Sequence, residues 1–408
     1  MTHRGARHVY SNLAPLIAMK ITRIECTPLS MPLKKPLRLP NVTITCLNTV
    51  LLRVYADTGL VGVAESGDTS SWYRGESQAS IVSMICDVFA PRILLGEDPR
   101  NIEKIVGAMD TLARDNNQAK ALVDCALHDL KGKALGVPVY DLLGGRTREA
   151  VPLGWVLSAG EPEQVASTAV AAREAGYAAF KLKVGRGTFE NDIATAAAVR
   201  TALGDGARIM LDANGSWNYE EALRTIRRLD RYRLDFVEQP LPHWDRDGMA
   251  RLRERVETPI YADEGAQELH HLREIAERRS ADGVILKVQK VGGLLKAQRF
   301  LAVCRLYDLP VFCSTLIGSG IEACPSTHLW VADQWACQFM SESAGPLAVH
   351  AAWNSDDIPP GEDLALGGQR FHRGHAYPNE RPGYGVDVDE TLLARIGTPG
   401  KPAVSVGE

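Results

Sequence analysis

Five lysine, aspartate and glutamate residues recur at nearly equal intervals through the middle of the chain, each at the end of a short apolar run. Successive members are 24 to 29 residues apart, which is about the length of one β-strand, one helix and their connections. This spacing predicts that the five side chains lie at matched ends of successive strands, around one opening. The five residues are Lys183, Asp212, Glu238, Asp263 and Lys287.

Three of the five are carboxylates, and carboxylates that converge on one point raise one another's pKa values by repulsion. A divalent cation removes this conflict, and Mg²⁺ prefers carboxylate oxygens while leaving positions for substrate and water. We therefore expect Asp212, Glu238 and Asp263 to bind Mg²⁺, for which Mn²⁺ can substitute. Zn²⁺ fits less well because no histidine or cysteine joins the set. Any one of these acids alone would be interpreted as a surface or helix-capping residue.

Two lysines flank one leucine in the strand-like segment FKLKVG. Side chains alternate along a strand, so Lys181 and Lys183 are predicted to leave the same face. A lysine that accepts a proton must be neutral, whereas the pKa of free lysine is about 10.4. Burial, a nearby metal ion and the second ammonium group would each lower the pKa of Lys183. Lys287 lies four strands away in an eight-stranded ring and would therefore face Lys183. The alternative, that Lys181 and Lys183 merely reach solvent from the edge of a strand, does not explain the position of Lys287.

Eight short apolar segments, separated by amphipathic helical stretches, would position these residues. Eight such strand–helix units within about 200 residues predict a TIM barrel. A doubly wound open sheet is the alternative, but it explains the even spacing less well, and no G-x-G-x-x-G follows the first segment. The segments begin near residues 152, 178, 208, 235, 259, 283, 310 and 338.

The remainder of the chain indicates a second structural unit. Alternating residues rich in Thr, Val and Leu are followed by a helical periodicity, which predicts a small antiparallel meander and then helices. The C-terminal stretch, rich in Gly, Pro and His, is expected to return to this unit. The predicted fold class is α/β, a modified TIM (β/α) barrel with an α+β capping domain. We divide the chain into a disordered extension (1–18), the capping domain (19–145), the barrel (146–350) and the returning segment (351–408).

Composition excludes several classes of function. The chain has 408 residues, 45% of them hydrophobic, and a formal net charge of −4. It therefore lacks the basic field that nucleic-acid binding requires, and no apolar run reaches the roughly 20 residues of a membrane span. The eight cysteines form no CxxC pair, which favours free thiols in a reducing compartment. We expect a cytoplasmic homo-oligomer that binds a small-molecule carboxylate.

The motifs together resemble the enolase superfamily, and within it the muconate-lactonizing-enzyme subgroup of the mandelate racemase/muconate lactonizing enzyme family. The resemblance covers nearly the whole chain and rests on KLK, DANGSW, VEQPL, ADEG and LKVQKVGG. It implies that Lys183 and Lys287 are the acid/base pair and that Lys181 helps to bind the substrate carboxylate. The three acids would hold the metal. Asn214 is implied as a substrate-binding or supporting residue, and Glu264 as a supporting residue.

The chain departs from the family pattern in two places. Many members carry a glutamate after the seventh strand, where this sequence has Gly318, with Glu322 four residues later. Dipeptide epimerases carry a DxD after the eighth strand, where this sequence has Ser341 and Glu342. We expect the metal chemistry to be retained despite both changes. We do not expect the substrates that are familiar from the family to be retained.

Substrate choice is predicted to lie in two loops of the capping domain, residues 33–44 and 67–75, because loops on a rigid scaffold commonly carry specificity. Trp72 and Tyr73 in the second loop are candidate exposed substrate-binding aromatics. An equally weighted alternative is that Trp72 packs against the barrel.

The predicted reaction is removal of the proton α to a carboxylate, with stabilisation of the resulting enediolate. Lysines on both faces favour a racemase or epimerase of a small carboxylate or amino-acid derivative. A muconate-type cycloisomerase, or a dehydratase acting for example on a cyclic hydroxy amino acid, shares the same first step. More remote alternatives are a non-catalytic binding barrel and a pyridoxal-phosphate barrel, in which the GSG of residues 318–320 would hold the phosphate.

Overall fold

The computed structural model describes residues 18–70, 73, 75–337, 340–342 and 345–408. Residues 1–17 of the predicted disordered extension therefore lie outside the described residues. Trp72 also lies outside them. No helix in the described part of the chain is long and apolar enough to cross a membrane.

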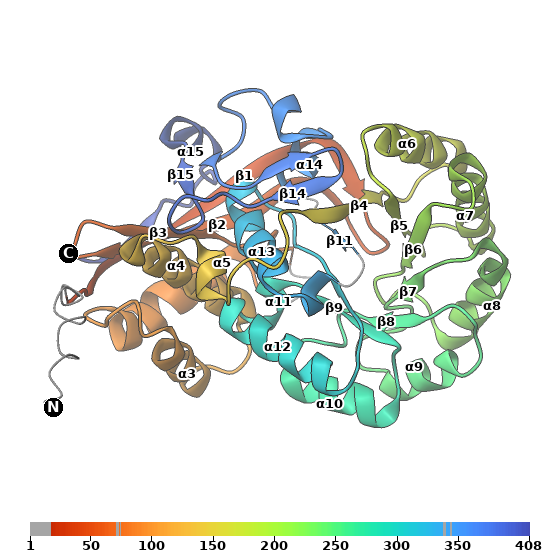
Figure 1. The fold of residues 1–408 in the computed structure, drawn as a ribbon, viewed down its shortest axis with the longest axis horizontal. Coiled ribbons are helices and arrows are strands. Elements are labelled where there is room, and N and C mark those ends of the chain that lie inside the picture. Colours follow the sequence, from red (N-terminus) through yellow and green to blue (C-terminus); the bar gives the residue numbers. More distant parts are fainter. Residues whose placement is uncertain (1–17, 71–72, 74, 338–339, 343–344) are drawn as a thin grey trace, which may run out of the picture.

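Eight parallel strands form a closed barrel, which confirms the predicted fold class (Figure 1). Each strand pairs with the next along the chain, and the last closes the ring by pairing with the first. The strands are β4 (Val151–Leu157), β5 (Ala179–Lys183), β6 (Arg208–Asp212), β7 (Phe236–Glu238), β8 (Ile260–Ala262), β9 (Gly283–Leu286), β10 (Val311–Cys313) and β11 (Ser341–Glu342).

Helices cover the outside of the barrel (Figure 1). Helix α8 illustrates how the sequence specifies them: Asn218 and Glu221 form a reciprocal capping box at its start, and its buried face repeats at helical spacing through Ala222, Ile226 and Leu229. The helices are α6 (Pro162–Glu174), α7 (Phe189–Leu203), α8 (Tyr219–Leu229), α9 (Arg246–Arg253), α10 (Leu269–Arg278), α11 (Val288–Val291), α12 (Leu294–Leu306) and α13 (Gly320–Ala332).

The barrel interior is apolar at one level and polar at the next. A buried cluster of one residue from each of six neighbouring strands fills the lower level. Because inward-facing side chains repeat every second residue, the residue two positions further along five of these strands is a lysine or an acid. The apolar layer therefore closes the barrel directly beneath the polar one. Its members are Ala179, Met210, Phe236, Tyr261, Ile285 and Phe312.

The capping domain is an antiparallel sheet covered by helices. Gly62 on its third strand lets α4 approach closely, because a Cβ there would overlap the backbone oxygen of Ala126. The backbone N–H of Val63 also donates to Asp129 on α4, at 2.9 Å. The elements are β1 (Ile21–Arg38), β2 (Thr43–Ala56), β3 (Val61–Glu65), α2 (Gln78–Ser83), the π-helix η1 (Met84–Leu94), α3 (Ile102–Leu112), α4 (Asn117–Leu135) and α5 (Val139–Leu142).

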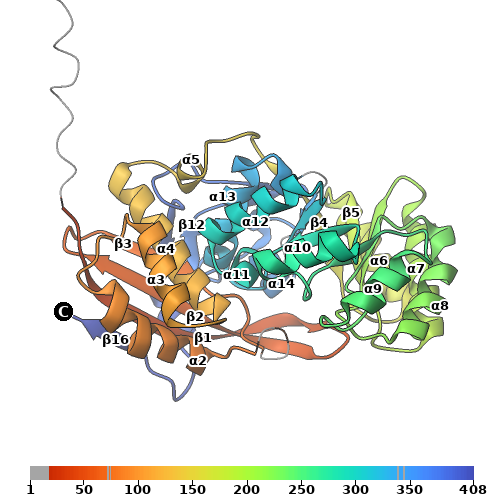
Figure 2. The ribbon, with the colours of Figure 1, turned by 90° about the horizontal axis from the view of Figure 1, so that it is seen from below.

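The C-terminal segment joins the two parts. Its last strand pairs with β1 of the cap, and β14 adds an antiparallel strand to β4 of the barrel. The β1–β2 hairpin extends from the cap toward the barrel (Figure 2), where Arg186 donates to the backbone oxygen of Leu39 at 2.6 Å. The segment contains α14 (Gly345–His350), β12 (Ala365–Gly367), β13 (Arg370–His372), β14 (His375–Tyr377), β15 (Val386–Val388), α15 (Glu390–Ile396) and β16 (Val404–Gly407).

A buried carboxyl group, Glu65 at the end of β3, ties the cap to the barrel loop that follows β10. It accepts a hydrogen bond from the Thr49 hydroxyl at 2.7 Å and from the Ser319 backbone N–H at 3.1 Å. The Ser319 hydroxyl donates to it as well. Burial raises the pKa of Glu65 to about 7, although these hydrogen bonds oppose the shift.

We predict that Glu65→Gln changes how stability depends on pH. The raised pKa means that Glu65 contributes most stability below its ordinary pKa, and that this contribution is lost as the pH rises through about 7. The Gln amide stays neutral, and it can accept from Ser319 while donating to Thr49. The free energy of unfolding of the variant, minus that of the wild type, should therefore increase by about 2 kcal/mol as the pH rises from 5 to 8.

Urea unfolding at several pH values measures this difference, with the exposed Glu149→Gln as the matched control. A difference between wild type and Glu65→Gln that stays constant over this pH range would contradict the prediction.

Candidate active site

The barrel brings the five predicted residues to the carboxyl-terminal ends of five consecutive strands. Lys183, Asp212 and Glu238 are the last residues of β5, β6 and β7, and they lie beside one another in register. Asp263 and Lys287 follow the last residues of β8 and β9 directly. The equal spacing in the sequence therefore corresponds to adjacent positions around the mouth of the barrel.

Each of the three carboxylates forms an ion pair with a lysine. The nitrogen–oxygen distances are 2.5 Å for Lys183–Asp212, 2.6 Å for Lys181–Glu238 and 2.6 Å for Lys287–Asp263. All three carboxylates are essentially inaccessible to solvent. Charges buried to this extent need such compensation, because the penalty for removing an ion from water is several kcal/mol.

The pKa values follow from this pairing. Burial raises the pKa of Glu238 well above its usual range, and repulsion from Asp212 and Asp263 adds to the shift. Burial would also raise the pKa of Asp263, but the ammonium groups of Lys287 and Lys290 hold it well below its usual range. The pKa of Lys287 lies well above its ordinary value because attraction to Asp263 outweighs burial.

Lys181 is directed toward carboxylates. Besides Glu238 it pairs with Glu342, and these two acids hold its pKa above the usual lysine value despite burial. Its predicted contact with a substrate carboxylate, and its predicted effect on Lys183, stay predictions.

The chemistry of the acidic residues fits a hard divalent cation. The Oε1 atom of Glu238 is buried and has no hydrogen-bond partner among the described residues. All the donors are carboxylate oxygens, the ligands that Mg²⁺ prefers. Within the described residues, no three His, Cys, Asp or Glu side chains converge as a ready-made metal site; the acids are turned toward their lysines instead. A cation bound by Asp212, Glu238 and Asp263 would relieve the repulsion that raises the pKa of Glu238.

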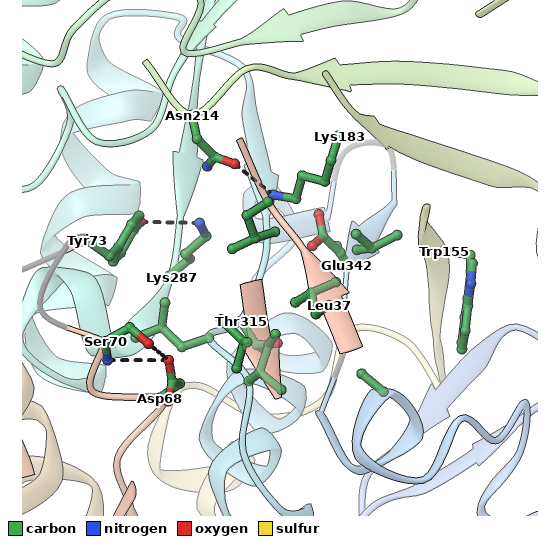
Figure 3. Close-up of a pocket in the computed structure, with 16 residues that line it drawn as sticks. Leu37, Asp68, Ser70, Tyr73, Trp155, Lys183, Asn214, Lys287, Thr315 and Glu342 are labelled. Carbon is green, nitrogen blue, oxygen red and sulfur yellow. Dashed lines mark hydrogen bonds between the residues drawn. The ribbon is translucent and has the colours of Figure 1, made fainter. Parts of the chain in front are cut away.

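A cavity of about 110 Å³ lies above the polar layer (Figure 3). Lys183 and Lys287 both line it, from strands that are four apart in the eight-stranded ring. The other lining residues are Leu37, Leu39, Ile44, Asp68, Ser70, Tyr73, Trp155, Val156, Asn214, Thr315, Leu316, Ile317, Glu342 and Ala348.

Asn214 and Glu264 lie together, as the resemblance implies. The Asn214 side chain accepts from Lys183 at 3.3 Å and donates to Glu264 at 3.1 Å. Burial raises the pKa of Glu264 to about 7, and repulsion from Asp263 and Asp212 contributes. Asn214 therefore links the amine of Lys183 to the carboxyl group of Glu264, the residue that follows Asp263.

Tyr73 corrects the prediction of an exposed aromatic side chain. It is partly buried, and its hydroxyl lies 3.0 and 3.1 Å from the two carboxylate oxygens of Asp263 and 3.2 Å from the Lys287 nitrogen. Burial and the Asp263 charge raise the pKa of Tyr73 well above its usual value, so the hydroxyl keeps its proton. Tyr73 therefore connects the capping domain directly to a candidate metal-binding residue and a candidate acid/base lysine.

Lys290 was not identified from the sequence. It is fully buried, and its ammonium group donates to an Asp263 carboxylate oxygen at 2.8 Å. It also donates to the backbone oxygens of Asp263 and Ile285, at 2.9 and 2.6 Å. The signal was a second lysine three residues after Lys287 in an apolar stretch, where a charged side chain requires a buried partner.

The structure gives a physical reason for the departure after the seventh strand. A Cβ atom at Gly318 would lie 2.5 Å from the Cβ atom of Glu322 and 2.8 Å from its Cγ atom. The Glu322 side chain therefore occupies the space that a side chain at position 318 would need. After the eighth strand, Glu342 lines the cavity and pairs with Lys181.

The alternative of a phosphate site at residues 318–320 is not supported. The backbone N–H groups of Ser319 and Gly320 already donate to the carboxyl groups of Glu65 and Asp363, at 3.1 and 3.0 Å. Two acidic side chains at this position would repel a phosphate.

Known proteins resemble this chain in sequence and in fold. A family model described as "Mandelate racemase / muconate lactonizing enzyme, N-terminal domain" matches residues 21–144, and one described as "Enolase C-terminal domain-like" matches residues 164–392. The crystal structure of a mandelate racemase/muconate lactonizing family protein from Azoarcus sp. EbN1 is similar, with 56% identity and a TM-score of 0.90. It covers 95% of this chain and 100% of its own.

Two further relatives have more specific names. An N-succinyl-L-Arg/Lys racemase from Bacillus cereus is 30% identical over 379 residues, which is 93% of this chain and 98% of that protein. A dipeptide epimerase from Enterococcus faecalis V583, whose structure is a complex with Mg and the dipeptide L-Leu-L-Tyr, is 27% identical with a TM-score of 0.81. It covers 90% of this chain and 99% of its own.

We predict that Asp212→Asn lowers the affinity for Mg²⁺ at least about 10-fold, because the amide keeps the shape of the side chain but removes its charge. Isothermal titration calorimetry with Mg²⁺ measures the change. The control is Asp205→Asn, an exposed carboxylate paired only with exposed Arg233 in the described structure. Equal affinities of the wild type and Asp212→Asn would show that Asp212 is not a ligand.

Proposed function

Because the chain belongs to the mandelate racemase/muconate lactonizing enzyme family of the enolase superfamily, we propose that it is a racemase or epimerase of a small carboxylate or amino-acid derivative. Its relatives are isomerases, and the chain is an enzyme of this class. The proposed reaction removes the proton α to the substrate carboxylate and returns a proton to the opposite face.

One observation carries the proposal: Lys183 and Lys287 reach the same cavity from strands on opposite sides of the barrel. A planar enediolate held between them would present one face to each amine. In one direction Lys183, as the neutral amine, accepts the α-proton while the Lys287 ammonium donates one. The reverse direction exchanges these roles, so that both enantiomers are substrates.

The remaining residues prepare the two lysines. Asp212, Glu238 and Asp263 would hold Mg²⁺, which when bound stabilises the negative charge that develops on the substrate carboxylate. Asn214 orients the amine of Lys183 through the hydrogen bond between them. Tyr73 does the same for Lys287. The apolar walls of the cavity limit access of water to the reacting carbon.

The size of the cavity favours a compact substrate. An engineered protein cavity of about 150 Å³ accommodates benzene, so 110 Å³ suits a molecule of comparable size. A neighbouring cavity of about 390 Å³ shares Leu37, Trp155, Val156, Ile317 and Ala348 with it. The two cavities therefore adjoin along these five residues.

We predict that Lys183→Ala and Lys287→Ala each reduce racemisation at least about 100-fold, yet exchange the α-protons of opposite enantiomers. Each variant keeps one lysine, which can still remove and return a proton on its own face. The assay loads the protein with Mg²⁺ and follows deuterium incorporation from D₂O into chiral amino and hydroxy acids by NMR. Lys104→Ala, an exposed lysine paired with Glu97, is the control.

The same spectra separate the related reactions. Loss of water or ring closure in place of inverted configuration would identify a dehydratase or a cycloisomerase. Exchange of the same enantiomer by both variants would reduce one lysine to an electrostatic role and refute the two-base proposal.

A further inference from the structure

Asp68 is a cavity-lining acid that the proposed reaction does not use. It lies three residues after the end of β3, in the loop that the capping domain places over the barrel. Its backbone N–H donates to the backbone oxygen of Ile317 at 2.8 Å, which fixes the loop to the segment that follows β10. Ile317 lines the same cavity. Asp68 is thus held in place by both domains.

Neutral donors orient the Asp68 carboxylate. The backbone N–H of Asn48 donates to Oδ1 at 3.0 Å, and that of Ser70 donates to Oδ2 at 3.3 Å. The Ser70 hydroxyl donates to Oδ2 as well (Figure 3). A carboxylate has about four acceptor positions, so this arrangement leaves capacity for a further donor from the cavity.

A cationic partner distinguishes four other acids of the site from Asp68, whereas Glu264 has the neutral partner Asn214. Lysines pair with Asp212, Glu238, Asp263 and Glu342, the last of which also lines the cavity. No lysine, arginine or histidine in the described part of the chain forms an ion pair with Asp68. Burial raises the pKa of Asp68 despite its hydrogen bonds, and no described residue offsets its negative charge with an ion pair.

The cavity therefore has two polar regions that favour ligand groups of opposite charge. Lys183, Lys287 and the predicted metal site suit the substrate carboxylate, whereas Asp68 suits a positive charge. Apolar side chains from the β1–β2 hairpin and the loop after β10 lie among the other lining residues: Leu37, Leu39, Ile44, Leu316 and Ile317. A cavity of this size limits how far apart the two charged groups of a substrate can be.

We propose that Asp68 binds the protonated nitrogen of the substrate, and that the substrate is a compact zwitterion: an α- or β-amino acid, open-chain or cyclic, with a basic nitrogen. The inference rests on the proposed function and specifies its substrate class. An N-acylated amino acid has no cationic nitrogen next to its reacting carbon and would leave the Asp68 charge buried without a partner. Such an unpaired group is the basis of strong discrimination between otherwise similar substrates.

The test compares three carboxylates with the same carbon skeleton: an amino acid, its hydroxy-acid analogue and its N-acetyl derivative. Deuterium exchange at the α carbon in D₂O is measured for the Mg²⁺-loaded wild type, for Asp68→Asn and for the exposed control Asp87→Asn. We expect the wild type and the control to prefer the amino acid at least about 100-fold in kcat/KM. Asp68→Asn should reduce this ratio at least about 10-fold.

The ratio of kcat/KM values separates recognition of the substrate nitrogen from damage to the loop that contains Asp68. A merely structural role of Asp68 would lower exchange of all three compounds together and leave the ratio unchanged, which would overturn the proposal. Comparable exchange of the hydroxy acid and the amino acid by the wild type would overturn it too, while leaving the proposed function intact.

Exchange of none of the tested carboxylates would instead count against the proposed function. Calorimetric binding of the amino acid to the wild type and to Asp68→Asn then decides the role of Asp68 without turnover. Affinity at least about 10-fold weaker in the variant would support the inference, and equal affinities would overturn it.

Discussion

The burial of several negative charges at the mouth of one barrel is the constraint on which the rest of this structure depends. Three acids are withdrawn from water there, and each such charge is costly unless a partner of opposite sign lies within contact distance. Lys181, Lys183, Lys287 and Lys290 supply those partners in the described structure. The lysines that would transfer protons are therefore also the groups that keep the acidic cluster electrostatically tolerable, and a divalent cation would take over part of that role when bound.

The barrel meets this constraint through the alternation of side chains along each strand. One inward-facing position carries an apolar residue of the closed lower layer, and the next carries a charged residue of the site. The apolar layer closes the barrel from below, and the hairpin and loop of the capping domain line the cavity above it. Contacts such as those of Tyr73 with Asp263 and of Glu65 with Ser319 make the cap part of the site.

The candidate catalytic residues belong to the barrel, whereas many residues that line the cavity come from the cap and from loops. The paired lysines and acids lie on the barrel strands, which the chain shares with relatives of 27 to 56% identity. Besides Lys183, Asn214 and Lys287, the residues that line the cavity come from the cap, β4, the loop after β10, the end of β11 and α14. They include Glu342, which pairs with Lys181, and Asp68, which has no cationic partner among the described residues.

The sequence by itself determined the features that follow from local periodicity. Strand–helix units of nearly constant length place Lys183, Asp212 and Glu238 at adjacent strand ends, because parallel strands in a barrel share one carboxyl-terminal edge. The fold class, the eight strands and the candidate metal-binding acids could be predicted for that reason.

Only the tertiary structure decided which groups from different parts of the chain meet. Tyr73 contacts Lys287 across 214 positions, and the backbone of Asp68 contacts that of Ile317. No periodicity encodes such pairs, because loop paths depend on the packing of the whole cap against the barrel. The ion-pair partners of Lys181 could not be predicted for the same reason. Its position on the strand determines on which face of the sheet its side chain lies, but the fold determines which carboxylates surround it.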